Sequence, residues 1–287
     1  MAPSGTETTL AGIVLAGGRS SRMGTAKAAL DWHGTSLVYR TASVLARVAA
    51  PVVVVRAPDQ HLPPLPPEVE VVVDRAEGRG PLEGMAAGMR AVGDRAVAAF
   101  VAATDMPMLH PEFVRSIAAA LGDADVALPV IGGHNHPLAA VYRTALRAKI
   151  EDLLAAGRLR PAYVWEDAVL RRVDESSARH PESVGNVNTP EEFAAVLALP
   201  LPLIGIDVYG TVRTRLGLSR MEVHAATLGA ALDALVAHSA RPGVDRTLGP
   251  SQADVLVALN GERFRSDPST PLVDGDRLAL LTQEAGG

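Results

Sequence analysis

The sequence predicts an α/β protein, in which a doubly wound, mostly parallel sheet is followed by a small α+β domain. Three observations support this fold class. Short β-branched runs alternate with amphipathic helical patterns from residue 11 to 198, a glycine-rich loop follows the first run, and the rhythm changes after residues 199–203. A chain of 287 residues is long enough for about two domains.

The first part of the chain contains five apolar runs of strand length. They occupy residues 12–16, 51–55, 69–73, 97–101 and 124–128. Between and after them lie helical patterns at residues 36–48, 83–91, 111–121, 144–156 and 190–198, the last with Thr189 as N-cap and Pro190 at the first helical position. Continuous apolar runs between amphipathic helices indicate a parallel sheet covered on both faces.

A proline-rich stretch, Leu199 to Leu203, separates the two domains that we expect. Its alternating prolines resist both a helix and a central strand. Beyond it the sequence predicts strands near residues 203–209, 221–224, 254–260 and 277–281 and a helix at 228–238. We therefore expect one domain at residues 1–200 and a small α+β domain at residues 203–287.

Composition excludes several functional classes. The net charge of -5 disfavours a general nucleic-acid-binding protein, which needs a basic surplus. The absence of cysteine excludes disulfides, zinc–cysteine sites, iron–sulfur clusters and a thiol nucleophile. No apolar stretch approaches the ~20 residues that span a bilayer. We expect a soluble, cytoplasmic protein that binds neither membrane nor nucleic acid.

The loop after the first strand has the composition of a phosphate site. Three glycines and three basic residues, Arg19, Arg22 and Lys27, fall within residues 17–27. Glycines let backbone N–H groups approach an anion. The spacing matches neither a Walker A motif nor the dinucleotide fingerprint. A tight turn with solvated basic residues is the alternative, but the charge at a strand's carboxyl end favours phosphate binding.

Two later strands end in aspartate, and these carboxylates are candidate magnesium ligands. Asp74 follows residues 69–73, and Asp105 follows the run at 97–101. Carboxyl ends of parallel strands face the ligand crevice, and Mg²⁺ prefers oxygen ligands. For Asp74 a loop-capping role is equally favoured, whereas for Asp105 the metal role is favoured over a turn before Pro107.

Asn186 and Asn188 alternate before the last helix of the first domain, so both side chains would point the same way in an extended segment. Helix capping explains Thr189 but not both asparagines, and amides could bind a pterin or a phosphate. His134-Asn135-His136 spells a nuclease-like tripeptide, but nothing nearby supports a metal site, and we interpret His134 as a solvated loop residue.

The segment from Leu15 to Lys27 resembles the signature of the molybdenum cofactor guanylyltransferases, which join GMP from GTP to molybdopterin. The resemblance implies a Rossmann-like nucleotidyltransferase domain. It also implies a nucleotide site formed by Leu15, Ala16, Gly17, Gly18, Arg19, Arg22, Lys27, Asp74, Gly80, Pro81 and Asp105. In this family a Gly-Gly pair accompanies guanine and Ala-Gly accompanies cytosine, so Gly17 favours GTP. A CTP-dependent or sugar-phosphate enzyme of the same fold is the alternative.

The same resemblance implies the roles of the reacting groups. The acceptor's terminal phosphate attacks the α-phosphorus of GTP and pyrophosphate leaves, with Arg22, Lys27 and Asp105 as catalytic residues. Asp105, within Thr104-Asp105-Met106-Pro107, matches the family's Mg²⁺-binding aspartate. The acceptor, molybdopterin, is implied to lie near His136, Arg158, Arg160, Asn186 and Asn188. The family usually has adjacent basic residues in this segment, whereas here Leu159 separates Arg158 from Arg160.

The C-terminal 85 residues resemble the small subunit of molybdopterin synthase and related ubiquitin-like sulfur carriers of the β-grasp fold. The resemblance rests on residues 257–261, residues 271–276 and the final Gly286-Gly287. It implies adenylation of the Gly287 carboxylate by an activating enzyme and conversion to a thiocarboxylate. The implied partners are the synthase large subunit, that activating enzyme, and molybdoenzymes or their chaperones. A non-catalytic scaffold for the carrier is the remaining alternative.

Overall fold

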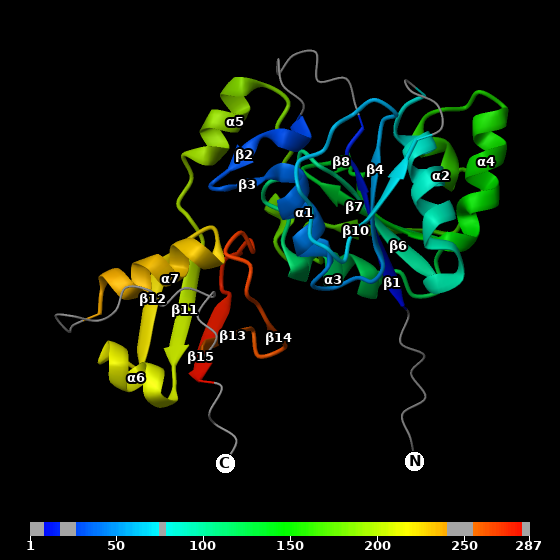
Figure 1. Cartoon of the computed structure of the whole chain (residues 1–287). Coiled ribbons are helices and arrows are strands. Elements are labelled where there is room, and N and C mark those ends of the chain that lie inside the picture. The colour runs from blue at the N-terminus through cyan, green and yellow to red at the C-terminus, as the bar shows by residue number, and fades with distance from the viewer. Residues whose placement is uncertain (1–8, 18–26, 75–78, 240–254, 283–287) are drawn as a thin grey trace, which may run out of the picture. The chain divides into compact units, whose positions relative to one another are not determined.

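The computed structural model describes residues 9–17, 27–74, 79–239 and 255–282. The chain divides into two compact units, the first made essentially of the residues up to Ala194 and the second of those from Ala195 (Figure 1). Each unit has its own hydrophobic core. Within the described residues, no helix combines the length and the apolar composition needed to cross a membrane.

The first unit is built on a sheet whose described strands follow the order β10-β7-β9-β6-β1-β4-β5. These strands are β1 (Leu10–Leu15), β4 (Val52–Arg56), β5 (Glu70–Val73), β6 (Ala98–Ala103), β7 (Val126–Ile131), β9 (Ala139–Arg143) and β10 (Leu170–Asp174), with β8 (His134–Asn135) beside β7. β5, β4, β1 and β6 run parallel, as do β7 and β10. β9 is antiparallel to both β6 and β7, so the prediction of a mostly parallel sheet is confirmed.

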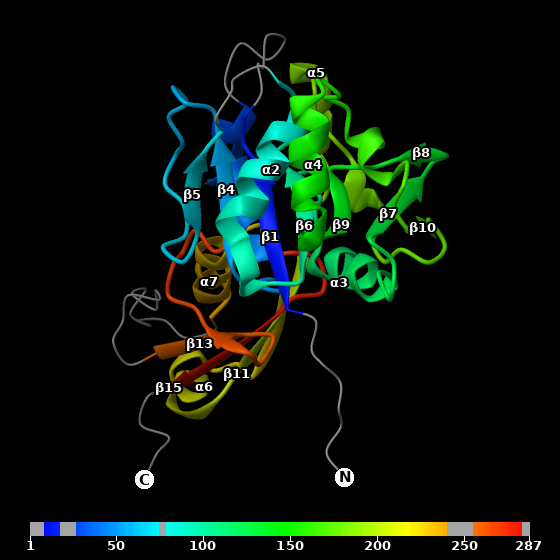
Figure 2. The ribbon, with the colours of Figure 1, turned by 90° about the vertical axis from the view of Figure 1, so that its right-hand side faces the viewer.

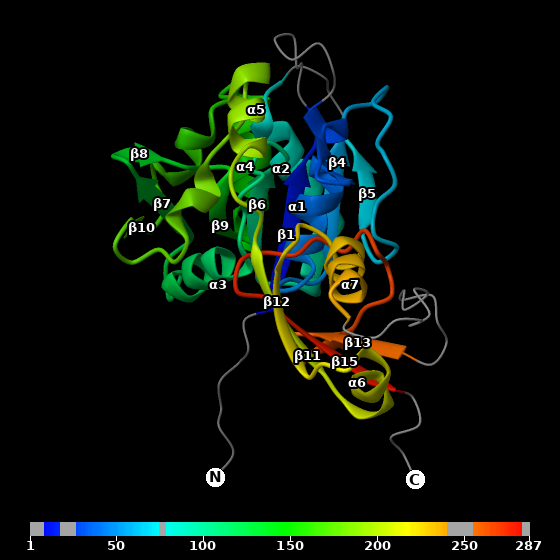
Figure 3. The ribbon, with the colours of Figure 1, turned by 90° about the vertical axis from the view of Figure 1, so that its left-hand side faces the viewer.

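Helices cover both faces of this sheet. α2 (Pro81–Val92) and α4 (Arg147–Ala155) lie on the face seen in Figure 2, and α1 (Leu37–Leu45) and α3 (Pro111–Ala120) on the opposite face, seen in Figure 3. The doubly wound arrangement is therefore confirmed. α2 packs closely on β1 because Gly84 and Gly88 face the strand. A Cβ at Gly88 would lie only 2.5 Å from Cγ2 of Ile13.

Several strands before residue 175 were not predicted from the sequence. A hairpin of β2 (Asp31–Trp32) and β3 (Thr35–Ser36) follows the 3-10 turn η1 (Lys27–Ala29) and leads into α1. The short strand β8, the antiparallel strand β9 and the edge strand β10 were not predicted either. The last helix, α5 (Pro190–Leu197), begins as predicted, since Thr189 Oγ1 accepts a hydrogen bond from the Glu192 N–H at 3.1 Å.

The second unit is a mixed sheet in the order β12-β11-β15-β13-β14. Its elements are β11 (Leu203–Val208), α6 (Gly210–Leu216), β12 (Arg220–His224), α7 (Leu228–Ala237), β13 (Val255–Leu259), β14 (Arg263–Phe264) and β15 (Arg277–Thr282). β11 and β15 are parallel, and the other pairs are antiparallel. α6 lies where the sequence predicted only a loop between two strands. Apolar side chains of both helices and of alternate strand positions form the core.

Candidate active site

The four parallel strands β5, β4, β1 and β6 end at the same edge of the sheet, and three of them are followed by a candidate functional residue. Gly17 comes after β1, Asp74 after β5 and Asp105 after β6. Arg56 is the last residue of β4, the strand between β1 and β5. Ligands of open α/β sheets bind in the crevice outside these strand ends. The parallel register thus gathers residues that are far apart in the sequence.

Lys27 connects three segments at this edge. Its Nζ donates to Asp105 Oδ2 at 2.7 Å and to Asn188 Oδ1 at 2.8 Å. The Lys27 and Asp105 side chains are only 19% and 17% exposed, so the pair is largely shielded from solvent. A triphosphate-binding candidate, a metal-binding candidate and an acceptor-binding candidate therefore meet in one cluster.

The carboxylate of Asp105 has room for a second interaction. While Oδ2 accepts from Lys27, Oδ1 is buried and has no hydrogen-bond partner among the described residues. A buried, unsatisfied carboxylate oxygen is costly and calls for an explanation such as an ion. Within the described parts of the chain no cluster of three or more acidic, histidine or cysteine side chains forms a metal cage. This donor set fits Mg²⁺, which needs one or two carboxylates and takes its remaining ligands from phosphates and water.

The segment before α5 is held against the Asp105 turn. The Val187 N–H donates to the Asp105 carbonyl at 2.9 Å, and Val187 is fully buried. On either side of it Asn186 and Asn188 are exposed. The Asn188 N–H donates to Glu192 Oε2 at 2.6 Å, so the first turn of α5 also fixes this segment. Backbone bonds thus hold one asparagine within reach of Lys27.

The remaining acceptor candidates come from two other loops. His136 Nε2 lies 3.3 Å from the Ile131 carbonyl oxygen, and buried Tyr142 donates its hydroxyl to the Pro137 carbonyl at 2.8 Å. Burial raises the pKa of Tyr142, which keeps the phenol protonated as a donor. Arg158 pairs with Glu166, and its guanidinium carbon lies 4.1 Å from the Tyr163 ring centroid. Arg160 is exposed.

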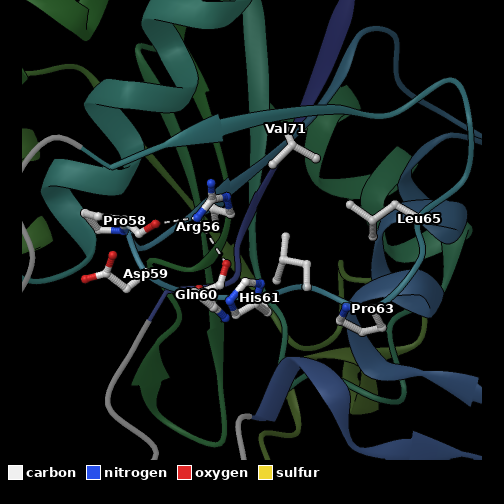
Figure 4. Close-up of a pocket in the computed structure, with 9 residues that line it drawn as sticks. Arg56, Pro58, Asp59, Gln60, His61, Pro63, Leu65 and Val71 are labelled. Carbon is white, nitrogen blue, oxygen red and sulfur yellow. Dashed lines mark hydrogen bonds between the residues drawn. The ribbon is translucent and has the colours of Figure 1, made fainter.

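A pocket of about 520 Å³ lies beside β4 and β5, and sequence reasoning missed it. Figure 4 shows Arg56 between Val71 on β5 and the loop that follows β4. Arg56 Nη1 donates to the carbonyl oxygens of Ala57, Pro58 and Gln60, which fixes the loop. Gln60 Nε2 in turn donates to the Ala16 carbonyl at 2.8 Å. The pocket therefore adjoins the start of the glycine-rich loop, and only the position of Arg56 at a strand end could have indicated it.

Other predicted site residues lie elsewhere in the first unit, and some lie outside the described residues. Leu15 and Ala16 are buried at the end of β1. The Asp74 N–H donates to the Arg56 carbonyl at 2.8 Å. Gly80, with φ +77°, precedes Pro81 at the start of α2. The predicted residues outside the described parts are Gly18, Arg19, Arg22 and Gly287.

The family match and the names of the relatives identify a nucleotidyltransferase, whose doubly wound sheet carries the Lys27–Asp105 pair at its carboxyl edge. Residues 12–172 match the MobA-like NTP transferase domain, and the chain belongs to that family. The matched region ends before Ala195, where the main part of the second unit begins, so the family assignment concerns the first unit.

Curated relatives agree with this assignment. A probable molybdenum cofactor guanylyltransferase of Mycobacterium tuberculosis is 42% identical over 185 residues, which cover 63% of this chain and 89% of the relative. A protein of the same description from Mycobacterium ulcerans is 37% identical over 191 residues, covering 65% of this chain and 92% of the relative.

Solved structures show the same fold. Molybdopterin-guanine dinucleotide biosynthesis protein A from Archaeoglobus fulgidus is 23% identical with a TM-score of 0.51, covering 64% of this chain and 95% of that one. Rv0371c from Mycobacterium tuberculosis is 18% identical with a TM-score of 0.53, covering 68% of this chain and 100% of that one. At these identities the similarity supports the fold alone.

Proposed function

We propose that the protein transfers GMP from GTP to the terminal phosphate of molybdopterin and releases pyrophosphate. The observation that carries the proposal is the Lys27 cluster, where Nζ lies within 2.8 Å of oxygens of both Asp105 and Asn188. The names of the curated relatives support the same activity. The proposed chemistry needs a triphosphate, a metal and an acceptor at one point, and these three residues suit those roles.

In this reaction the chain's own residues bind and orient two anionic substrates. Lys27 and Arg22 neutralise the triphosphate and the departing pyrophosphate, while Asn188 and Asn186 hold the acceptor. Positioning and charge neutralisation are the main requirements of phosphoryl-group chemistry, because the negative charge is already present on both reactants. The acceptor phosphate is itself the nucleophile, so no side-chain nucleophile is needed.

Asp105 is the residue that would hold Mg²⁺, through the buried Oδ1 that has no partner among the described residues. When bound there, the ion would supply charge neutralisation for the phosphate groups. Lys27 occupies the other carboxylate oxygen at 2.7 Å. In this proposal Oδ1 of Asp105 would bind Mg²⁺, while Oδ2 accepts a hydrogen bond from Lys27.

Nucleobase choice rests on the beginning of the glycine-rich loop. Gly17 and Gly18 support GTP over CTP, and Asp74, Gly80 and Pro81 border the same strand ends and are proposed to contact the nucleotide. Leu15, Ala16 and Arg19 complete that site. The pocket of about 520 Å³, whose Gln60 bonds the Ala16 carbonyl, gives room for a base beside this loop.

The test is pyrophosphate release by purified protein with Mg²⁺, molybdopterin and either GTP or CTP. Release with GTP alone supports the guanylyltransferase, and release with CTP alone identifies a cytidylyltransferase. Failure to bind either nucleotide would contradict the proposal and favour a scaffold role for the first unit. The acceptor contacts of His136, Arg158 and Arg160 are tested by the KM for molybdopterin in alanine variants.

We further propose that residues 1–200 form the transferase domain and residues 203–287 a β-grasp sulfur carrier. The mixed sheet packed against α7 supports the second assignment, as does the Gly-Gly sequence at residues 286–287. The carrier would be adenylated on Gly287 by an activating enzyme and would serve the synthase large subunit. Intact-mass analysis first checks that Gly287 carries the free carboxylate, and then whether oxygen is exchanged for sulfur. If Gly287 is never adenylated, the carrier role is wrong.

A further inference from the structure

Arg40 is a buried charged residue that none of the roles above explains. It lies in the middle of α1 and is only 4% exposed. Arginine is almost never fully buried unless it is paired, because removing its charge from water is costly. An exposed position on the same helix would avoid that cost, so the burial of Arg40 calls for a specific interaction.

One interaction of Arg40 reaches the turn that carries Asp105. The Arg40 Nε donates to the Pro107 carbonyl at 2.6 Å, across 67 positions of sequence. Met106, which lies between Asp105 and Pro107, is buried. Its carbonyl accepts a hydrogen bond from the Leu109 N–H at 3.1 Å. A hydrogen bond from a charged donor is about twice as strong as a neutral one. Arg40 therefore fixes the backbone two residues beyond the proposed metal ligand.

A second interaction reaches the segment that carries Asn188. The Arg40 guanidinium carbon lies 5.5 Å from the centroid of the Trp32 ring, and that ring lies 6.5 Å from the ring of Phe193 in α5. The Phe193 N–H donates to the Thr189 carbonyl at 3.0 Å, in the first turn after Asn188. A cation over an indole face is attracted to the ring's negative potential. Arg40 is thereby linked to α5 through Trp32.

The third segment, which carries Lys27, is joined to the start of the same helix. Lys27 begins η1, and the next residue after that turn, Leu30, accepts a hydrogen bond from the Leu37 N–H at 3.0 Å. α1 begins at Leu37, one turn before Arg40. All three members of the Lys27 cluster thus come from segments held by α1 or by the Arg40–Trp32 pair.

We propose that Arg40 is a positioning residue, which sets the distance between the Asp105 carboxylate and the groups facing it, Lys27 and Asn188. The inference rests on the proposed function, since it concerns the geometry of that reaction. A planar guanidinium can bond a carbonyl through its edge and stack on an indole through its face at once, and a lysine ammonium cannot do both. Misplacement of a reacting group by about 1 Å costs on the order of 100-fold in rate.

The experiment compares Arg40→Met, Arg40→Lys and Trp32→Phe with the wild-type chain. Mn²⁺ binding is measured by calorimetry, pyrophosphate release gives kcat and KM, and hydrogen exchange follows residues 104–109 and the Val187 N–H. We expect Arg40→Met to lower kcat about 100-fold, to weaken Mn²⁺ binding, and to speed exchange of the Val187 N–H, which bonds the Asp105 carbonyl. Arg40→Lys should restore part of each loss. Trp32→Phe should give a smaller loss of the same kind.

Thr41→Val is the matched control. Thr41 is the next residue of α1, is equally buried, and donates its hydroxyl to the Leu37 carbonyl at 2.9 Å within the same helix. Its replacement should change stability while leaving Mn²⁺ affinity and kcat as in the wild type. If Arg40→Met does not fold, Arg40→Lys and Trp32→Phe carry the test.

The experiment distinguishes a failure of the proposed function from a failure of the Arg40 inference. If wild-type protein releases no pyrophosphate with either nucleotide, the proposed function is wrong, and hydrogen exchange and Mn²⁺ binding still test Arg40. If wild-type protein is active but folded Arg40 variants match Thr41→Val in kcat, Mn²⁺ affinity and Val187 exchange, Arg40 is structural only and the inference is overturned.

Discussion

The two units of this chain present their chemistry in different ways. In the first unit, side chains from distant segments contact one another at the carboxyl edge of a parallel sheet, as in the bonds of Lys27 to Asp105 and Asn188. In the second unit, the described residues build a core and surface ion pairs, and the proposed reactive group, Gly287, lies outside them. The transferase needs a site assembled by the fold, whereas the proposed carrier needs only a stable domain that bears its tail.

The substitution with the largest expected effect removes the proposed metal ligand from the first unit. Asp105→Asn should abolish transfer, with at least about a 1000-fold loss of kcat, because the side chain that would hold Mg²⁺ loses its charge. Pyrophosphate release and Mn²⁺ binding measure the effect. Asp94→Asn changes an exposed aspartate and serves as the control. Normal turnover in Asp105→Asn would rule out the metal assignment, while the proposed thiocarboxylate formation at Gly287 should be unaffected in either case.

The next largest effect is expected at Lys27. Its replacement should weaken catalysis but strengthen metal binding. Lys27→Met should lower kcat/KM for GTP about 100-fold, because a cation that neutralises the triphosphate is removed. The same change should raise the affinity for Mn²⁺ without nucleotide about tenfold, because the ammonium 2.7 Å from Asp105 Oδ2 no longer competes for the carboxylate. Arg95→Met, at an exposed ion pair with Glu70, is the control. Weaker Mn²⁺ binding in Lys27→Met would contradict the competition.

The sequence predicts this site in part, and the missing parts have physical reasons. An apolar run that ends in an acidic residue is a local pattern, which can be read without knowing the fold. Such runs therefore indicated strand ends and the position of Asp105. The contact of Lys27 with Asn188 spans 161 positions and depends on how the Asp105 turn pairs with Val187, which no local pattern encodes. Arg40 carries no sequence signal of its role, because its burial follows only from the packing of α1.

Elements of the fold were missed where the sequence carries no local pattern. The helices of the first unit and the parallel strands β1, β4, β5, β6 and β7 were predicted within a few residues, whereas β10, which pairs parallel with β7, was missed. β9 was missed because the short run Ala139–Arg143 becomes a strand only by pairing antiparallel with β6. In the second unit α6 was missed because it is a short helix with only Val212 and Leu216 buried, which is too few apolar positions for a periodic signal.

Core substitutions should show whether the two units unfold independently, because each substitution destabilises only one unit. Leu235 in α7 is fully buried in the core of the second unit. Leu235→Ala should lower the free energy of unfolding of that unit by about 2–5 kcal/mol, through lost burial and the cavity left behind. Denaturant unfolding followed by hydrogen exchange in each unit measures this, and transfer at low denaturant should be unchanged.

Gly88→Ala is the matched change in the first unit. The added Cβ would meet Ile13 Cγ2 at 2.5 Å, so we expect a loss of about 1–3 kcal/mol from overpacking. In Gly205→Ala of the second unit the nearest contact is an ordinary 3.6 Å, and the effect should be small. If either core variant shifts both unfolding transitions equally, the two units do not unfold independently.

The smallest expected effect is a pH dependence confined to the second unit. Arg277, together with Arg220, donates hydrogen bonds to Asp207 and holds the pKa of that carboxyl below its usual value. Because the folded pKa is depressed, the stabilising contribution is present above the unfolded pKa of about 3.9 and is lost as the pH falls through the folded pKa. Asp207→Asn should therefore lower the unfolding midpoint of the second unit slightly at pH ~7 and much less at pH ~3. Asp233→Asn, at an exposed position of α7, is the control.

The ion-pair explanation is contradicted if the unfolding midpoints of wild type and Asp207→Asn differ by the same amount at both pH values. A shift in the unfolding transition of the first unit would show that the two units are coupled.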